Sequence, residues 1–170
     1  MFLGQEFKIF DWFIIHFTEN NGMAFGLEFG GDTGKILLSL FRIVVVIFGI
    51  YYVNQLTKNK LPNGALTSLG LVIGGAIGNI FDGVFYGVFF NDSYNQIAEF
   101  LPSTGGYSSL LKGKVVDMFY FPLINTHLPE WLPLFANKHF IFFRPVFNLA
   151  DAGISVGMIL LIVFYRKHFR

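Results

Sequence analysis

The chain has 170 residues, of which 54% are hydrophobic and 14% charged, and its mean hydropathy is +0.56. Soluble domains carry about 25% charged residues, so part of this surface must face lipid rather than water. A net charge of +1 provides no basic stripe to neutralise phosphates, which argues against a nucleic-acid partner. The absence of cysteine excludes a thiol nucleophile, and the four histidines lack metal-ligand spacing, so we expect no metal and no cofactor.

The N-terminal segment 7–21 (FKIFDWFIIHFTENN) is aromatic and rich in β-branched side chains, and it runs into Asn20-Asn21-Gly22. This pattern predicts a strand that enters a turn outside the membrane. No apolar span precedes the strand to carry it to that side. Either the N-terminus is translocated directly, or a further helix comes before this segment in the full protein, and we favour the second explanation.

Three segments are long and apolar enough to cross a bilayer, namely 36–53, 61–81 and 147–165. The Lys and Arg residues that flank membrane spans tend to lie in the cytoplasm. They occur here between the first two spans and after the third, at Lys58, Lys60, Arg166, Lys167 and Arg170. We therefore predict a multi-pass protein whose segments 1–35 and 82–146 lie on the outer face.

Small residues recur at helical spacing within two of these spans. The second span contains Gly70, Gly74 and Gly78, and the third contains Gly153 and Gly157. Small residues on one face let helix backbones approach closely in lipid. The spacing predicts that the spans pack into one compact bundle.

Three carboxylates lie near the predicted membrane boundary: Asp82, Asp117 and Asp151. A charged side chain at the bilayer centre costs about 3 kcal/mol, so such residues usually face a cavity. If Asp117 and Asp151 meet in a poorly hydrated site, they would share a proton, as the carboxylates of an aspartic peptidase do. Structural explanations remain open: Asp151 with Asn148 is placed to cap a helix, and Asp82 to pair with Arg42.

A second class of function is compatible with the same acids. Carboxylates within membrane spans also relay protons or bind cations. The alternative hypothesis is therefore a small membrane transport or binding protein, which proton flux in liposomes would reveal.

Four short motifs occur in an order seen in one family: NNGMAF at 20–25, GGAIGN at 74–79 with Asp82 behind it, VVDMF at 115–119 and FNLAD at 147–151. Together they resemble lipoprotein signal peptidase (signal peptidase II). The resemblance implies a mainly α-helical enzyme of the bacterial cytoplasmic (inner) membrane with a small outer β-rich and loop platform. Such an enzyme has four membrane helices, of which the first has no counterpart here, and its active site is at the extracytoplasmic face.

The resemblance also implies an activity and a set of site residues. The family removes signal peptides from diacylglyceryl-modified prolipoproteins by cleaving just before the lipidated cysteine. It needs lipidated substrate and membrane lipid as partners, without a cofactor, and we expect a monomer. The implied catalytic pair is Asp117 and Asp151, with Asp82 as structural support. The residues implied to line the pocket or position substrate are Asn20, Gly22, Gly75, Asn79 and Asn148.

One departure from the family pattern concerns an arginine. The family has Arg directly after the acidic residue of its GNxxD motif, where this chain has Gly83. We consider Arg42 and Arg144 as replacements, and we expect Arg42, like Asp82, to give structural support to the site.

Between the motifs, the outer segment contains Gly105-Gly106 and an aromatic-rich insert over 123–143. The insert fits a platform at the membrane interface. It is interpreted either as a lid over a lipidated substrate or as an interfacial anchor.

Overall fold

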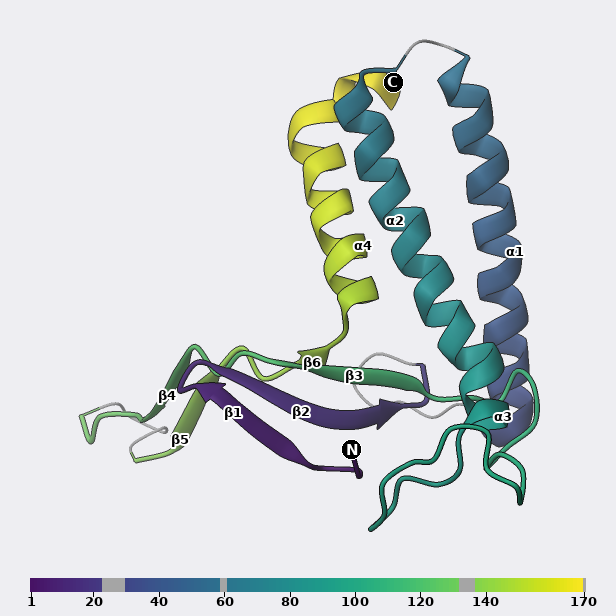
Figure 1. The fold of residues 1–170 in the computed structure, drawn as a ribbon. Helices are drawn as coiled ribbons and strands as arrows, with labels where there is room; N and C mark the ends of the chain where they lie inside the picture. The colour runs from purple at the N-terminus through teal and green to yellow at the C-terminus, as the bar shows by residue number, and fades with distance from the viewer. Residues whose placement is uncertain (23–29, 59–60, 132–136, 170) are drawn as a thin grey trace.

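Three long helices stand side by side, and a sheet lies across one end of them (Figure 1). The computed structural model describes residues 1–22, 30–58, 61–131 and 137–169. Lys60, Arg170 and the 23–25 part of the NNGMAF motif lie outside the described residues. Each of the three helices is long and apolar enough to cross a membrane, as the sequence predicts.

Each helix extends beyond its predicted C-terminal limit, and the first also begins earlier than predicted. The first helix, α1, is Gly31–Thr57. The second is α2, Asn63–Phe81, which is continued by a π-helical turn, Asp82–Tyr86, and by α3, Gly87–Phe89. The third is α4, Leu149–Leu160, which is continued by a π-helical turn, Leu161–Tyr165, and a 3-10 turn, Arg166–Phe169. The expected outer segment from 82 to 146 thus begins inside a helix. The reason is that Val84, Phe85 and Val88 prolong the apolar run past Asp82.

Close packing of α2 on α4 depends on glycine, although only partly on the predicted positions. A Cβ atom at Gly157 would lie 2.6 Å from the carbonyl oxygen of Ser68, and one at Gly75 would overlap the carbonyl oxygen of Ala150. The packing role predicted for Gly157 is therefore confirmed. The same prediction is wrong for Gly70 and Gly74, because a Cβ atom there would meet no described atom within 4 Å.

The main sheet has four antiparallel strands in the order β1-β2-β3-β6: β1 is Glu6–Phe10, β2 is Phe13–Asn20, β3 is Val115–Tyr120 and β6 is Val146–Phe147. The single strand predicted over 7–21 is in fact a hairpin. The chain reverses at Asp11 and Trp12, because Phe10 pairs directly with Phe13.

The predicted turn after β2 is present. Gly22 adopts a positive φ of 87°, which glycine tolerates without steric cost. Its N–H donates to the side-chain oxygen of Asn20 at 2.9 Å, so the Asn side chain closes the turn.

The two faces of the main sheet differ in character. Directly paired residues share a face, so Phe7, Ile15, Phe119 and Phe147 lie on the same side as Asp117. The rings of Phe119 and Phe147 are 6.1 Å apart. The opposite face carries Glu6, Lys8, His16 and Tyr120.

The insert between β3 and β6 forms a second, two-stranded sheet. Strand β4, Ile124–His127, pairs antiparallel with β5, His139–Phe142. Between α3 and β3 the chain runs as loops with one isolated bridge from Phe90 to Phe100. The structure thus supplies a helix bundle and a β-rich platform that meet at one end of the bundle.

Candidate active site

Asp117 and Asp151 reach the same place from different elements. Asp117 lies in the middle of β3, and Asp151 is the third residue of α4. Only Asn148 separates the end of β6 from the start of α4. Because β6 is paired with β3, this short connection delivers the first turn of α4 to the strand that carries Asp117.

Asn148 begins α4 by a reciprocal capping arrangement. Its side-chain oxygen accepts a hydrogen bond from the Asp151 N–H at 2.9 Å, and the Asp151 carboxylate accepts one from the Asn148 N–H at 3.5 Å. Such a cap satisfies backbone N–H groups that have no partner within the helix. The FNLAD motif therefore encodes both the start of the helix and the position of Asp151.

Two asparagine amides link the two carboxylates. Asn148 Nδ2 donates to Asp117 Oδ1 at 2.8 Å and to Asn79 Oδ1 at 2.9 Å. Asn79 Nδ2 in turn donates to Asp151 Oδ1 at 2.7 Å. Asn20 Nδ2 lies 3.3 Å from the second oxygen of Asp117. Residues from all four sequence motifs or their immediate surroundings thus converge on one polar cluster.

The cluster is removed from solvent on the Asp117 side. Asp117 is 4% exposed and Asn148 is 8% exposed. Burial is the largest influence on Asp117 and raises its pKa to about 6. The hydrogen bonds from Asn20 and Asn148 oppose this rise, whereas the negative charges of Asp151 and Asp82 add to it. The site therefore contains a carboxyl group that binds a proton more readily than usual.

Asp82 contacts the strand that carries Asp117. Its carboxylate accepts a hydrogen bond from the Val116 N–H at 3.2 Å, one residue before Asp117. Among the described residues no salt bridge joins Asp82 to Arg42, so the sequence-based suggestion of that pair is wrong. Asp82 was not expected to lie within a helix, where it can reach β3.

Arg42 projects from α1 to the turn that follows β2. Its guanidinium donates a hydrogen bond to the carbonyl oxygen of Gly22, and it also interacts electrostatically with Asp151. Arg144 is exposed between β5 and β6. Of the two arginines considered as replacements at Gly83, Arg42 is the one that contacts a site residue.

Gly75 contributes through packing. The contact between Gly75 and the backbone of Ala150 brings α2 against the first turn of α4. Asn79 follows Gly75 by four residues and lies on the same helix face. The close approach at Gly75 consequently allows the Asn79 amide to reach Asp151.

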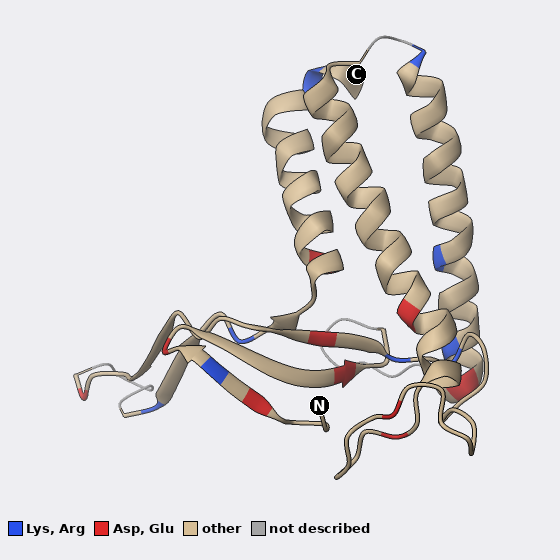
Figure 2. Ribbon diagram, viewed as in Figure 1, with Lys and Arg blue, Asp and Glu red and all other residues tan. Residues whose placement is uncertain are grey.

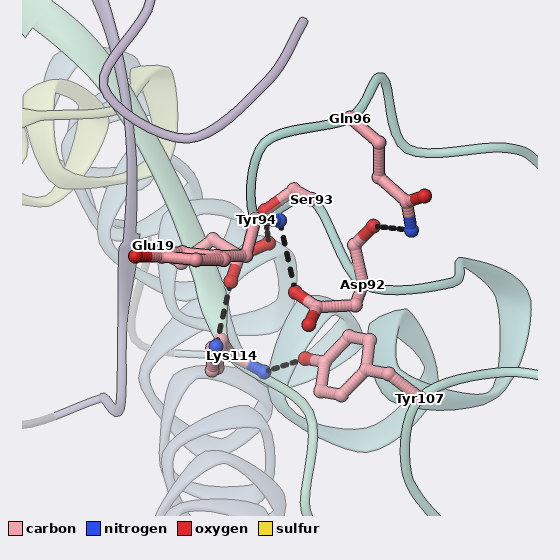
Figure 3. A network of polar contacts seen from close by, with 7 residues as sticks. All are labelled: Glu19, Asp92, Ser93, Tyr94, Gln96, Tyr107 and Lys114. Carbon is pink, nitrogen blue, oxygen red and sulfur yellow. Dashed lines mark hydrogen bonds and ion pairs between the residues drawn. The ribbon is translucent and has the colours of Figure 1, made fainter.

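Sequence reasoning missed a second polar network beside the site (Figure 3). The Glu19 carboxylate, whose side chain is 3% exposed, pairs with Lys114 Nζ at 2.7 Å and accepts a hydrogen bond from the buried Ser93 hydroxyl at 2.7 Å. The Lys114 N–H donates to the Tyr107 hydroxyl at 2.8 Å. These contacts tie the loop before β3 to β2, next to Asn20. An acid at the end of an apolar strand was the available signal, but its partners are distant in sequence.

The fold defines an integral membrane protein in which two carboxyl groups, linked through asparagine amides, lie where the helices meet the sheet. Residues 1–166 match the family described as signal peptidase (SPase) II, and the chain belongs to this family of bacterial membrane proteases. The resemblance seen in the motifs is thereby confirmed.

Curated relatives and solved structures are consistent with this assignment. A lipoprotein signal peptidase of Porphyromonas gingivalis is 52% identical over 168 residues, which cover 98% of this chain and 73% of the relative. A lipoprotein signal peptidase of Amoebophilus asiaticus is 36% identical over 162 residues, covering 95% of this chain and 64% of the relative. A bacterial membrane enzyme solved by the in meso method at 1.9 Å shares the fold, with a TM-score of 0.55, 23% identity, and coverage of 96% of this chain and 76% of that one.

Proposed function

We propose that the protein is an aspartic endopeptidase that removes the signal peptides of diacylglyceryl-modified prolipoproteins, cleaving just before the lipidated cysteine. The observation that carries this proposal is the hydrogen-bonded chain Asp117–Asn148–Asn79–Asp151. Two carboxyl groups that share a poorly hydrated site can hold one proton between them, which is the state that peptide hydrolysis requires.

The surroundings of the two carboxyl groups favour different roles. Asp151 lies in the first turn of α4, where the helix dipole and backbone N–H groups stabilise a negative charge. Asp117 is buried in a strand and has its pKa raised to about 6. We assign Asp151 as the general base and Asp117 as the carboxyl group that carries the proton.

The reaction then follows from this assignment. A water molecule loses a proton to Asp151, and its oxygen bonds to the scissile carbonyl carbon. The proton of Asp117 passes to the carbonyl oxygen, which gives a tetrahedral diol. When the C–N bond breaks, the nitrogen takes the proton from Asp151 and one hydroxyl proton returns to Asp117, so the pair is restored.

The remaining polar residues have supporting roles in this proposal. Asn79 and Asn148 orient the carboxylates to which they donate. Asn20 and Gly22 lie at the turn beside Asp117 and are proposed to bind the substrate backbone. Gly75 acts through helix packing, as its contact with Ala150 suggests.

The proposed membrane orientation places the site at the outer face of the inner membrane. Basic residues occur at the helix ends far from the sheet, and the acidic residues are concentrated towards the sheet (Figure 2). This distribution supports a cytoplasmic location for the helix ends near Lys58 and Arg166. We also propose that the protein acts as a monomer.

The test is the cleavage of a diacylglyceryl-modified precursor by purified variants in vesicles. Asp117→Asn and Asp151→Asn should each lower the cleavage rate by at least about 10³-fold, because each removes one of the two carboxyl groups that act together. The matched control is Asp11→Asn, whose side chain is 93% exposed in the β1–β2 turn and which should cleave normally. Cleavage at the normal rate by either site variant would contradict the mechanism.

A further inference from the structure

The β4–β5 hairpin has one apolar face that no other part of the described chain covers. In its register Ile124 pairs with Phe142 and Thr126 with Phe140, which places these four side chains on one face. Ile124 is 51% exposed, Phe142 50% and Phe140 37%. A hairpin with an uncovered apolar face is marginally stable in water, so this face requires an apolar partner.

The opposite face of the hairpin is mostly polar. It carries the pairs Asn125–Ile141 and His127–His139, and His139 Nε2 lies 2.6 Å from the Asn125 side-chain oxygen. The hairpin is therefore amphipathic, with no Lys, Arg, Asp or Glu in either strand. This pattern is typical of an element that lies flat on a boundary between apolar and aqueous media.

The position of the hairpin identifies the boundary. Three residues join β3 to β4, and three join β5 to β6. Because α4 begins two residues after β6 ends, this part of the sheet lies where a membrane-spanning helix begins. Figure 1 shows the hairpin as an outward extension of the sheet, away from the helices and across their direction.

A cluster of aromatic rings lies between the base of the hairpin and the start of α4. At the base of β5, the ring of Phe143 contacts Phe147 at 6.0 Å between ring centres, and Phe147 contacts Phe119 and Phe121. Phe119 shares its sheet face with Asp117, which Asn148 at the start of α4 contacts. This aromatic cluster thus faces the side of the sheet from which the helices rise. Continuity with lipid-facing helices favours lipid as the partner of the hairpin.

We propose that the β4–β5 hairpin lies at the boundary between the headgroups and acyl chains of a phospholipid bilayer, with Ile124, Phe140 and Phe142 turned towards the lipid. Trp131, at the far end of the hairpin, is 77% exposed in the protein and has the amphipathic ring that favours this boundary. The hairpin thereby anchors β3, and with it Asp117, at the membrane surface. This inference stands independently of the proposed peptidase activity.

The two tryptophans permit a direct test. In the Trp12→Phe variant, Trp131 is the sole tryptophan, and Phe preserves the stack of residue 12 on Phe10. The variant is reconstituted in phosphatidylcholine vesicles with or without bromine on the acyl chains. Trp131 fluorescence should be quenched at least about two-fold by the brominated lipid and protected from aqueous iodide.

Two further changes in the Trp12→Phe background identify which face of the hairpin contacts the lipid. Phe140→Ser with Phe142→Ser should abolish quenching by brominated lipid and expose Trp131 to iodide, while His127→Ser on the polar face should change neither. Circular dichroism and thermal unfolding check that the variants fold. Quenching that persists in the double serine variant would overturn the proposal. So would a Trp131 protected from both quenchers, which would indicate a protein partner.

Discussion

The strand that carries Asp117 and the helix turn that carries Asp151 provide opposite surroundings for an aspartate carboxyl group. Asp117 is enclosed in a sheet, and burial opposes its ionisation. Asp151 lies at a helix N-terminus, and its carboxylate takes part in the cap of that helix. The same residue type is therefore buried in a strand in one region and part of a helix cap in the other.

The difference arises from secondary structure more than from the neighbouring side chains. Both carboxylates accept hydrogen bonds from asparagine amides, and Asn148 contacts both residues. In β3, the hydrogen bonds that the Asp117 carboxylate accepts come from the side-chain amides of Asn20 and Asn148. The first turn of a helix has N–H groups without intrahelical partners, and these favour a negative charge.

Removal of the residue shared by both regions should have the largest effect. Asn148→Ala removes the donor to Asp117 and the cap of α4 together. We expect at least about a 100-fold loss in kcat, since the acid and base lose their alignment, and about 1 kcal/mol of stability lost with the cap. Precursor cleavage and thermal unfolding measure the two effects. Asn54→Ala, at an exposed site on α1, is the control, and an equal loss of activity there would contradict the assignment.

The stability of the two charge-removing variants should change in opposite directions. Asp117→Asn should raise Tm at pH 8, because it removes a buried carboxylate, whereas Asp151→Asn should lower Tm because it removes an anion from a helix N-terminus. The loss for Asp151→Asn is expected to be about 0.3–1 kcal/mol, which corresponds to roughly 1–4 °C. Scanning calorimetry in detergent measures both.

The raised pKa of Asp117 sets how the stability of the folded protein depends on pH. The folded-state pKa of about 6 lies above the ordinary aspartate pKa of 3.8, so the folded protein binds the proton more tightly than the unfolded chain does. The stability that the neutral carboxyl group contributes is complete below about pH 4 and is lost as pH rises through about 6. The advantage of Asp117→Asn should therefore grow across this interval. If the difference in Tm between the Asp117→Asn variant and the unchanged protein did not depend on pH, the surroundings of Asp117 would not raise its pKa as described.

The replacement of Asp82 should have the smallest effect on the difference between Asp117 and Asp151. Asp82→Asn keeps an oxygen that can accept from the Val116 N–H but removes a charge that raises the pKa of Asp117. If Asp117 acts as the acid, the alkaline limb of kcat/KM should move to lower pH by less than about one unit. The full pH profile of precursor cleavage measures this shift. Movement of the acidic limb in place of the alkaline limb would reverse the assigned roles of the two aspartates.

Much of the helical part was predictable because lipid imposes simple rules on sequence. A span needs about 20 apolar residues, so α1, α2 and α4 were all predicted. Their ends were less predictable, since the helical span that begins with α2 continues past Asp82 to Phe89. The hairpin of β1 and β2 was missed because Asp11-Trp12 is not a typical turn sequence.

The site divides in the same way. The sequence by itself determined that carboxylates and asparagines lie near the membrane boundary, because polar groups are too costly in lipid to occur there without a function. It also encoded the cap at Asn148 and Asp151, because a cap is a local interaction. It did not indicate which glycines make helix contacts. Glycines four residues apart share one face of α2, but this spacing does not say whether the face of Gly74 or the face of Gly75 packs on α4.

Only the tertiary structure decided that Asn79 bridges to Asp151, that Asn148 bridges to Asp117, and that Glu19 pairs with Lys114. Each of these contacts joins residues 31 to 95 positions apart. Their formation depends on the pairing of β3 with β2 and β6 and on the close approach of α2 to α4. Such long-range geometry results from packing of the whole chain, whereas the membrane spans and the helix cap follow from local sequence.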